Sequence, residues 1–113
     1  NDFEREKANT GEGGINSTMA VGIYPQGANS ALELLDLSGN VWEWCQDFWD
    51  SEYYRHSPSN NPRGPEIGNS RVVRGGSWLN YPDNCRYAFR NYFYPDNSFN
   101  NVGFRVCRSK PLP

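Results

Sequence analysis

Residues 71–78 read RVVRGGSW, and this stretch decides what the chain can build. Its first half alternates charged and apolar residues, which is the pattern of a half-buried strand. The paired glycines that follow indicate a bulge or a close approach of the backbone. A second run, VGFRVC at residues 102–107, predicts another strand near the end of the chain. We therefore expect a small sheet of short antiparallel strands.

The densest apolar stretch, residues 31–50, is predicted to carry most of the core. Residues 1–30 are mostly loop, with one short strand expected at residues 19–24. Residues 51–70 form a polar loop, much longer than an ordinary connection, which is either tied down or mobile. No helix longer than two turns is expected. The fold class is therefore α+β, with irregular backbone over more than half of the chain.

The composition of the 113 residues sets limits on size and partners. This length suits a single domain, and aromatic residues at 15% supply much of its apolar surface. No apolar run approaches the roughly 20 residues of a membrane helix, so no membrane segment is expected. A formal net charge of −2 argues against the basic surface that nucleic-acid binding requires.

Few side chains of this chain suit metal or nucleophilic chemistry. Cys45, Cys85 and Cys107 allow one disulfide and one free thiol, and their spacing matches neither a zinc ribbon nor a redox pair. This leaves the redox compartment open. His56 is the single histidine, so catalytic triads and multi-histidine metal sites are disfavoured, and we expect it to be an ordinary surface residue.

Three motifs occur in a distinctive order: DLSGNVWEW at residues 36–44, RVVRGGSW at 71–78 and GFR at 103–105. Together they resemble the formylglycine-generating enzyme, or sulfatase-modifying factor, family. The resemblance spans residues 1–113 as one domain, which corresponds to the C-terminal half to two-thirds of the family domain. It implies a C-type-lectin-like fold, with a compact antiparallel sheet and long loops. A preceding domain or a second chain is a candidate partner for an uncovered edge.

The resemblance also implies how this chain departs from the family's chemistry. Family enzymes oxidise a substrate cysteine and hold copper between two cysteines after the Gly-Gly-Ser-aromatic motif. Alignment on residues 75–78 places Asn80 and Cys85 at those two positions. A single thiolate cannot give Cu(I) linear ligation, so we expect no catalysis and a packed or disulfide-bonded Cys85. The alternatives are a formylglycine-generating or related oxidase with Cys85 catalytic, and a degenerate structural relative.

The family binds calcium in the loop that corresponds to residues 36–43. The implied ligands are the carboxylates of Asp36 and Glu43 and the carbonyls of Gly39 and Val41. In the alternative, Asp36 caps a turn and Glu43 pairs with an arginine. We expect Arg74, Arg90 and Arg105 to pair with these carboxylates or with loop carbonyls. No other cofactor is required.

Residues 79–102 have the composition of a binding loop. Seven of these 24 residues are Tyr or Phe and six are Asn. Rigid aromatic rings give contact area at low entropic cost, while asparagine supplies adaptable hydrogen bonds. No strand or helix period could bury all of these rings, so we expect an exposed apolar patch that marks a partner site.

The same window contains no Lys, Glu, Gln, Met or Trp, the residues whose codons all end in a purine. It resembles the variable region of proteins diversified by diversity-generating retroelements, in which template adenines, largely in asparagine codons, are mutated. The fixed positions of such regions are kept here. The differences from their asparagine-rich parent sequence fall mainly where that parent has asparagine. The ligand-facing set predicted in this way is Leu79, Asn80, Tyr81, Asp83, Asn84, Tyr87, Phe89, Asn91, Tyr92, Phe93, Tyr94, Ser98, Phe99, Asn100 and Asn101.

The sequence therefore predicts a non-catalytic domain that binds a protein or cell-surface ligand through residues 79–101. It also predicts that replacing Tyr92, Phe93 and Tyr94 by alanine abolishes binding while hardly changing the melting temperature.

Overall fold

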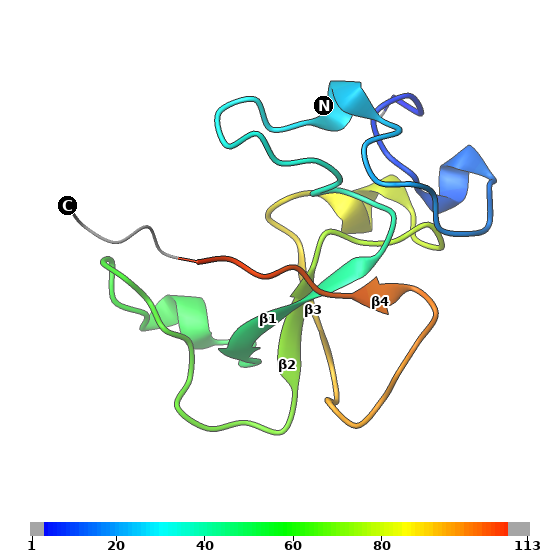
Figure 1. Ribbon diagram of the computed structural model, residues 1–113. Helices are drawn as coiled ribbons and strands as arrows, with labels where there is room; N and C mark the ends of the chain where they lie inside the picture. The colour runs from blue at the N-terminus through cyan, green and yellow to red at the C-terminus, as the bar shows by residue number, and fades with distance from the viewer. Residues whose placement is uncertain (1–3, 109–113) are drawn as a thin grey trace.

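The computed structural model describes residues 4–108, which surround one small four-stranded sheet (Figure 1). The strands are β1 (Trp42–Phe48), β2 (Arg71–Arg74), β3 (Arg90–Phe93) and β4 (Val102–Gly103), in the order β3-β2-β1-β4. The helical elements of residues 4–108 are short 3-10 turns: η1 (Gly11–Gly13), η2 (Pro25–Gly27), η3 (Tyr53–Arg55) and η4 (Pro82–Cys85). None of them has the length or apolar character needed to cross a membrane.

The strand predicted at residues 71–74 is confirmed as β2, whereas the one at 19–24 is wrong and the one at 102–107 is only partly right. Residues 19–24 form a turn, because Gly22 adopts a φ of 79° and the Ile23 N–H bonds back to the Ala20 carbonyl. The strand predicted over 102–107 is only two residues long. It also runs parallel to β1 rather than antiparallel.

One face of the sheet carries the aromatic core. Trp42 and Trp44 are two residues apart in β1, so both point to this face. Trp44 lies opposite Val73 of β2. Trp42 is 1% exposed and Val73 is fully buried. Phe93 of β3 meets both indoles edge-on, with centroids 6.3 Å from Trp42 and 6.2 Å from Trp44. A sheet this small therefore obtains its core volume from aromatic rings.

The opposite face ties down the long loop. The guanidinium carbon of Arg90 lies 4.1 Å from the Tyr54 ring and 4.9 Å from the Trp49 ring, in cation–π geometry. Within the loop, the Gly64 N–H donates to the Tyr53 hydroxyl at 3.1 Å. The alternative left open by the sequence is thus resolved in favour of an anchored loop.

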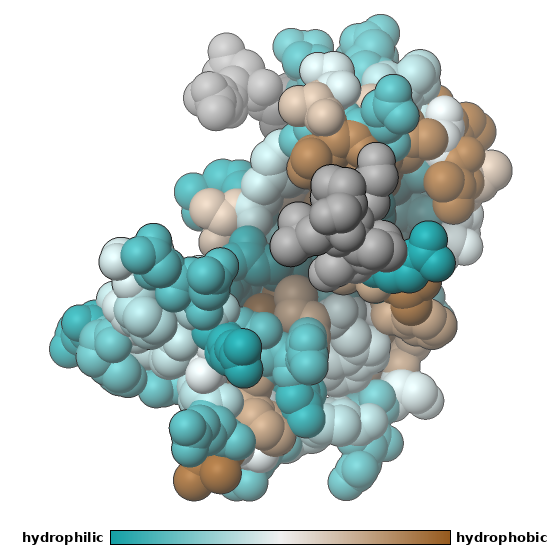
Figure 2. Space-filling view, turned by 60° about the vertical axis from the view of Figure 1, so that its left-hand side comes forward, coloured by the Kyte–Doolittle hydropathy of each residue, from teal (hydrophilic) through white to brown (hydrophobic). Residues whose placement is uncertain are grey.

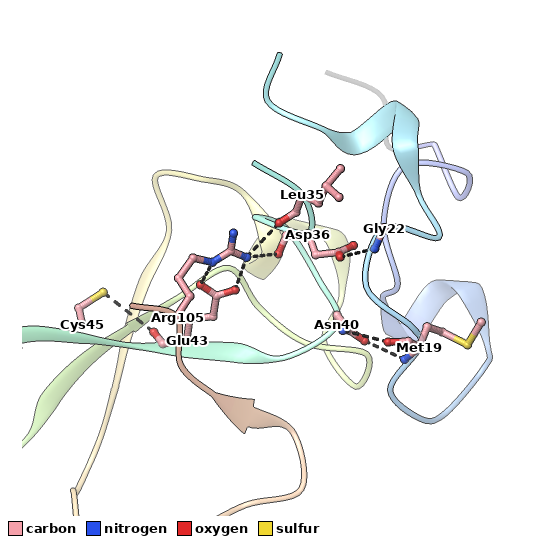
Figure 3. Close-up of polar contacts among 8 residues, drawn as sticks. All are labelled: Met19, Gly22, Leu35, Asp36, Asn40, Glu43, Cys45 and Arg105. Atoms are coloured by element: carbon pink, nitrogen blue, oxygen red, sulfur yellow. Dashed lines mark hydrogen bonds and ion pairs between the residues drawn. The ribbon is translucent and has the colours of Figure 1, made fainter. Parts of the chain in front are cut away.

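The N-terminal loops pack on the sheet through Asn40. Its N–H donates to the Asn9 carbonyl, and its side chain exchanges hydrogen bonds with the backbone of Met19 (Figure 3). Asn9 is 2% exposed. The turn at residues 38–40 therefore joins the start of the chain to the beginning of β1.

Candidate ligand-binding surface

Residues 79–101 leave β2, pass through η4, form the edge strand β3 and return toward β4 (Figure 1). Besides the pairing of β3 with β2 and the bonds to Ser77 described below, three long-range hydrogen bonds hold this segment to the rest of the chain. The Gly11 N–H donates to the Asn80 carbonyl at 2.8 Å, and the Trp42 N–H donates to the Asn101 carbonyl at 2.8 Å. The Arg74 guanidinium donates to the Tyr87 carbonyl at 2.7 Å. All three acceptors are main-chain oxygens.

Most of the aromatic residues predicted to face a ligand are exposed. Their exposed fractions are 77% for Tyr81, 53% for Tyr87, 42% for Tyr92, 55% for Tyr94 and 46% for Phe99; the aliphatic Leu79 is 61% exposed. Asp83, Ser98 and Asn100 are exposed as well. Apolar residues form several separate groups on the face shown in Figure 2 rather than one continuous patch.

Two phenylalanines of the predicted set face inward. Phe93 belongs to the aromatic core, and its ring centroid also lies 5.1 Å from that of Phe99. Phe89 is half-buried with its centroid 6.2 Å from Trp42. The physical reason is the two-residue period of a strand: Tyr92 points to one face of β3 and Phe93 to the other.

The half-buried asparagines of the set have intramolecular roles. Ser77 is fully buried; its hydroxyl lies 2.5 Å from Asn80 Oδ1 and accepts from Asn101 Nδ2 at 3.0 Å. Asn91 Oδ1 accepts from the Tyr92 N–H at 2.9 Å. Asn84 is half-buried within η4. The side chains of Asn80, Asn91 and Asn101 thus bond to groups of this chain.

Tyr54 extends the exposed aromatic surface beyond the predicted window. It is 62% exposed, lies beside Arg90, and its hydroxyl is 3.3 Å from an Arg74 nitrogen. Sequence reasoning missed it because the polar loop around it carries no motif. Only the contact with Arg90 shows that it belongs beside β3.

Cys85 and Asn80 do not fit the two-thiolate copper site of the family. The Cys85 side chain is 4% exposed, and its sulfur lies 4.0 Å from the Ser77 carbonyl. Burial raises the pKa of the Cys85 thiol to about 11, which disfavours the thiolate that Cu(I) needs. Asn80 is engaged with Ser77. Cys45, Cys85 and Cys107 are all free, so Cys85 is a packed cysteine.

The raised pKa of Cys85 predicts a pH-dependent loss of stability. Between about pH 9 and 11 the folded chain keeps a proton that the unfolded chain has released, so the free energy of unfolding falls as pH rises. We expect a loss of about 2 kcal/mol across this window, measured by urea denaturation at several pH values. Cys85→Ala removes this part of the slope, whereas Cys107→Ala, at an exposed site, leaves it in place. Equal slopes in the wild type and Cys85→Ala would contradict the prediction.

Two of the residues implied for calcium, Asp36 and Glu43, lie beside Arg105 (Figure 3). Arg105 Nε and Nη2 donate to the two carboxylate oxygens of Glu43 at 2.6 and 2.5 Å. Nη2 also donates to the carbonyls of Leu35 and Asp36 at 3.0 and 3.2 Å. The hydrogen bonds to Glu43 raise the pKa of Arg105. The expectation that arginines pair with these groups or with loop carbonyls is confirmed for Arg105 and Arg74.

This arrangement does not fit a calcium ion at Glu43. A fixed positive charge occupies both oxygens of its carboxylate, and Asp36 Oδ2 already accepts from the Gly22 N–H at 2.8 Å. Gly39 and Val41 lie in the turn before β1. Calcium binding stays a prediction of the sequence.

Comparisons with known proteins give the family context of this surface. A family model described as "Sulfatase-modifying factor enzyme 1-like domain" matches residues 1–110. The formylglycine-generating enzyme of Streptomyces coelicolor is 41% identical over 107 residues, which are 92% of this chain and 33% of that enzyme. The mouse "Inactive C-alpha-formylglycine-generating enzyme 2" is 30% identical over 112 residues, 95% of this chain and 31% of that protein. The chain thus spans about a third of the length of these curated relatives.

Among solved structures, Treponema denticola variable protein 1 superposes with a TM-score of 0.73 at 28% sequence identity. The match covers 88% of this chain and 35% of that protein. The predicted α+β, C-type-lectin-like fold is therefore confirmed, as a small curled sheet with mixed strand directions.

Proposed function

The chain belongs to the sulfatase-modifying factor enzyme 1-like family, and from this premise we propose that it is a non-catalytic ligand-binding domain with a diversified contact surface. The surface comprises the exposed side chains of residues 79–101 together with Tyr54. Its ligand is a protein or another cell-surface molecule. The frame that holds it is the sheet and the Gly-Gly-Ser-Trp turn.

The observation that carries this proposal is the difference in burial within one continuous segment. Of the positions that match the fixed part of such variable regions, Gly75, Gly76, Ser77 and Cys85 are buried, whereas Arg86, Ala88 and residues 95–97 are exposed. Most aromatic residues at the parent-asparagine positions are exposed instead, from 42% at Tyr92 to 77% at Tyr81. A folding core would bury such rings, whereas a contact surface displays them on a fixed scaffold.

The comparisons support this reading without deciding it. The family includes formylglycine-generating enzymes and a relative named as inactive, so membership alone assigns no activity. The likeness to a variable protein favours a binding role. Asn80 at one expected cysteine position, and a buried thiol at the other, disfavour copper chemistry.

The proposal is tested by sequencing the DNA around the codons for residues 71–113. We expect a nearby non-coding near-copy that differs from the coding sequence only where the copy carries adenine, together with a reverse-transcriptase reading frame. We also expect the differing codons to include those of Tyr81, Tyr92 and Tyr94. The codons of residues 42–48 serve as an internal control and should have no such copy.

Two results would overturn the proposal. The first is a segment with no near-copy and no variation among related cells. The second is stoichiometric copper bound by the purified protein and lost in Cys85→Ser, which would establish the formylglycine-generating alternative that the 41% identity to the Streptomyces enzyme favours.

A further inference from the structure

A polar cavity lies outside the diversified segment, where the ends of β1 and β2 meet the long loop. Its volume is about 430 Å³, and it is lined by residues of β1, of β2 and of the loop at 62–65. The loop passes below the C-terminal end of β1 and enters β2 directly (Figure 1). Every lining residue lies between Gln46 and Arg71, and so outside residues 79–101.

Arg71 presents a positioned guanidinium to this cavity. Its Cζ lies 3.7 Å above the centroid of the Phe48 ring, and Nη1 donates to the Gln46 carbonyl. An arginine has five N–H donors, and Arg71 makes no other side-chain hydrogen bond or ion pair within residues 4–108. The stacked ring fixes the plane of the group while most of its donors stay available.

Arg63 adds a second guanidinium from the loop. It is exposed, lines the same cavity, and forms no ion pair or hydrogen bond with any described residue. Asp47 is the single carboxylate of the lining. Two guanidinium groups against one carboxylate leave the cavity with a net charge of about +1, which favours an anion.

The shape of the donors favours a carboxylate. Guanidinium groups recognise planar, two-oxygen acceptors with paired N–H bonds, and such bonds are shorter and stronger than those between neutral groups. Arg71 lies directly opposite Phe93 in the β2–β3 register, and Tyr94 follows Phe93 in the chain. One lining residue of the cavity, Arg71, is therefore paired with the last residue of β3, which belongs to the segment of the proposed contact surface.

We propose that this cavity is a fixed subsite for a carboxylate, supplied by an acidic side chain of a protein ligand. The diversified aromatic residues would vary around an anchor that does not change. The role of the subsite in ligand binding rests on the proposed function, whereas its affinity for a carboxylate is a property of the cavity alone.

The test uses a capped four-residue peptide, Ser-Glu-Gly-Ser, and its glutamine counterpart Ser-Gln-Gly-Ser, each titrated into the full chain at 150 mM salt. The readout is the NMR signals of the arginine Nε–H groups. With the Glu peptide, we expect the signals of Arg63 and Arg71 to shift and to saturate at about millimolar peptide. The Gln peptide should bind with an affinity at least about tenfold lower. Arg63→Ala weakens binding about tenfold, while Arg55→Ala, which removes an exposed arginine outside the cavity, leaves it unchanged.

Arg71→Lys complements Arg63→Ala, because it keeps the charge at the start of β2 but removes the paired N–H geometry; weaker binding is expected. Equal affinity for the two peptides, or no effect of Arg63→Ala, would overturn the subsite. Tighter binding of inorganic phosphate than of the Glu peptide would also overturn the assignment to an acidic side chain. If the DNA near-copy is missing but the peptide still binds, only the proposed function is overturned. If the near-copy is present but the peptide does not bind, only the subsite is overturned.

Discussion

Alanine in place of Phe93 is expected to lower the free energy of unfolding by about 3 kcal/mol, more than any other aromatic replacement within residues 79–101. Its half-buried ring meets Trp42 and Trp44 edge-on and lies 5.1 Å from Phe99, so removing it opens a gap beside the two indoles. The rigid sheet cannot collapse to fill that space. The loss is measured by urea denaturation followed by circular dichroism.

The matched control is Tyr94→Ala, the next residue along the chain. Tyr94 is 55% exposed, so its replacement should change the free energy of unfolding by less than about 0.5 kcal/mol. Equal losses at the two positions would show that Phe93 is not the core residue described here. The triple replacement of Tyr92, Phe93 and Tyr94 would therefore unfold the scaffold, and Tyr92→Ala with Tyr94→Ala is the suitable pair for a binding test.

Gly76→Ala is expected to cost about 4 kcal/mol, which is most of the stability of an ordinary small domain. Gly76 adopts a φ of 69°, in the left-handed region that a side chain disfavours. A Cβ there would lie 2.3 Å from the Cys85 sulfur and 2.9 Å from the Cys85 Cα. No side-chain rotation relieves an overlap with the backbone, so η4 would have to move away from β2.

Gly13→Ala is the control for this change. A Cβ at Gly13 meets nothing within 4 Å, and its φ is not positive. The free energy of unfolding should stay within about 0.5 kcal/mol of the wild type. Thermal and urea denaturation of both variants measure the contrast, and a folded Gly76→Ala with unchanged stability would contradict the close packing of η4 on the Gly-Gly turn.

The sheet could be predicted in part, because some of its strands have local signals. The alternation in residues 71–74 predicts β2, and the turn at 38–40 correctly precedes β1. The run at 19–24 has the composition of a strand but lacks a partner, and Gly22 turns it. The last run is cut short because Arg105 bonds to Glu43 and to two carbonyls, a long-range contact that no local pattern contains.

The position of the candidate surface follows from composition, but the direction of each side chain does not. The excess of Tyr, Phe and Asn marks residues 79–102 as a whole. Phe93 and Tyr92 look alike in that count, yet β3 points them to opposite faces of the sheet. Only the pairing of β3 with β2, set by residues outside the window, separates Phe93, which packs on Trp42 and Trp44, from Tyr92, which stacks on Trp49 and stays 42% exposed.

Apart from the β2–β3 pairing and the side-chain bonds of Asn80 and Asn101 to Ser77, the long-range hydrogen bonds that hold residues 79–101 end on main-chain oxygens of Asn80, Tyr87 and Asn101. A carbonyl is the same in every amino acid, so these tethers are indifferent to which residue a codon specifies. Tyr87 can be exchanged without loosening its contact with Arg74, because the phenol takes no part in it. At positions held only through such carbonyls, the side chain can change while the backbone keeps its path.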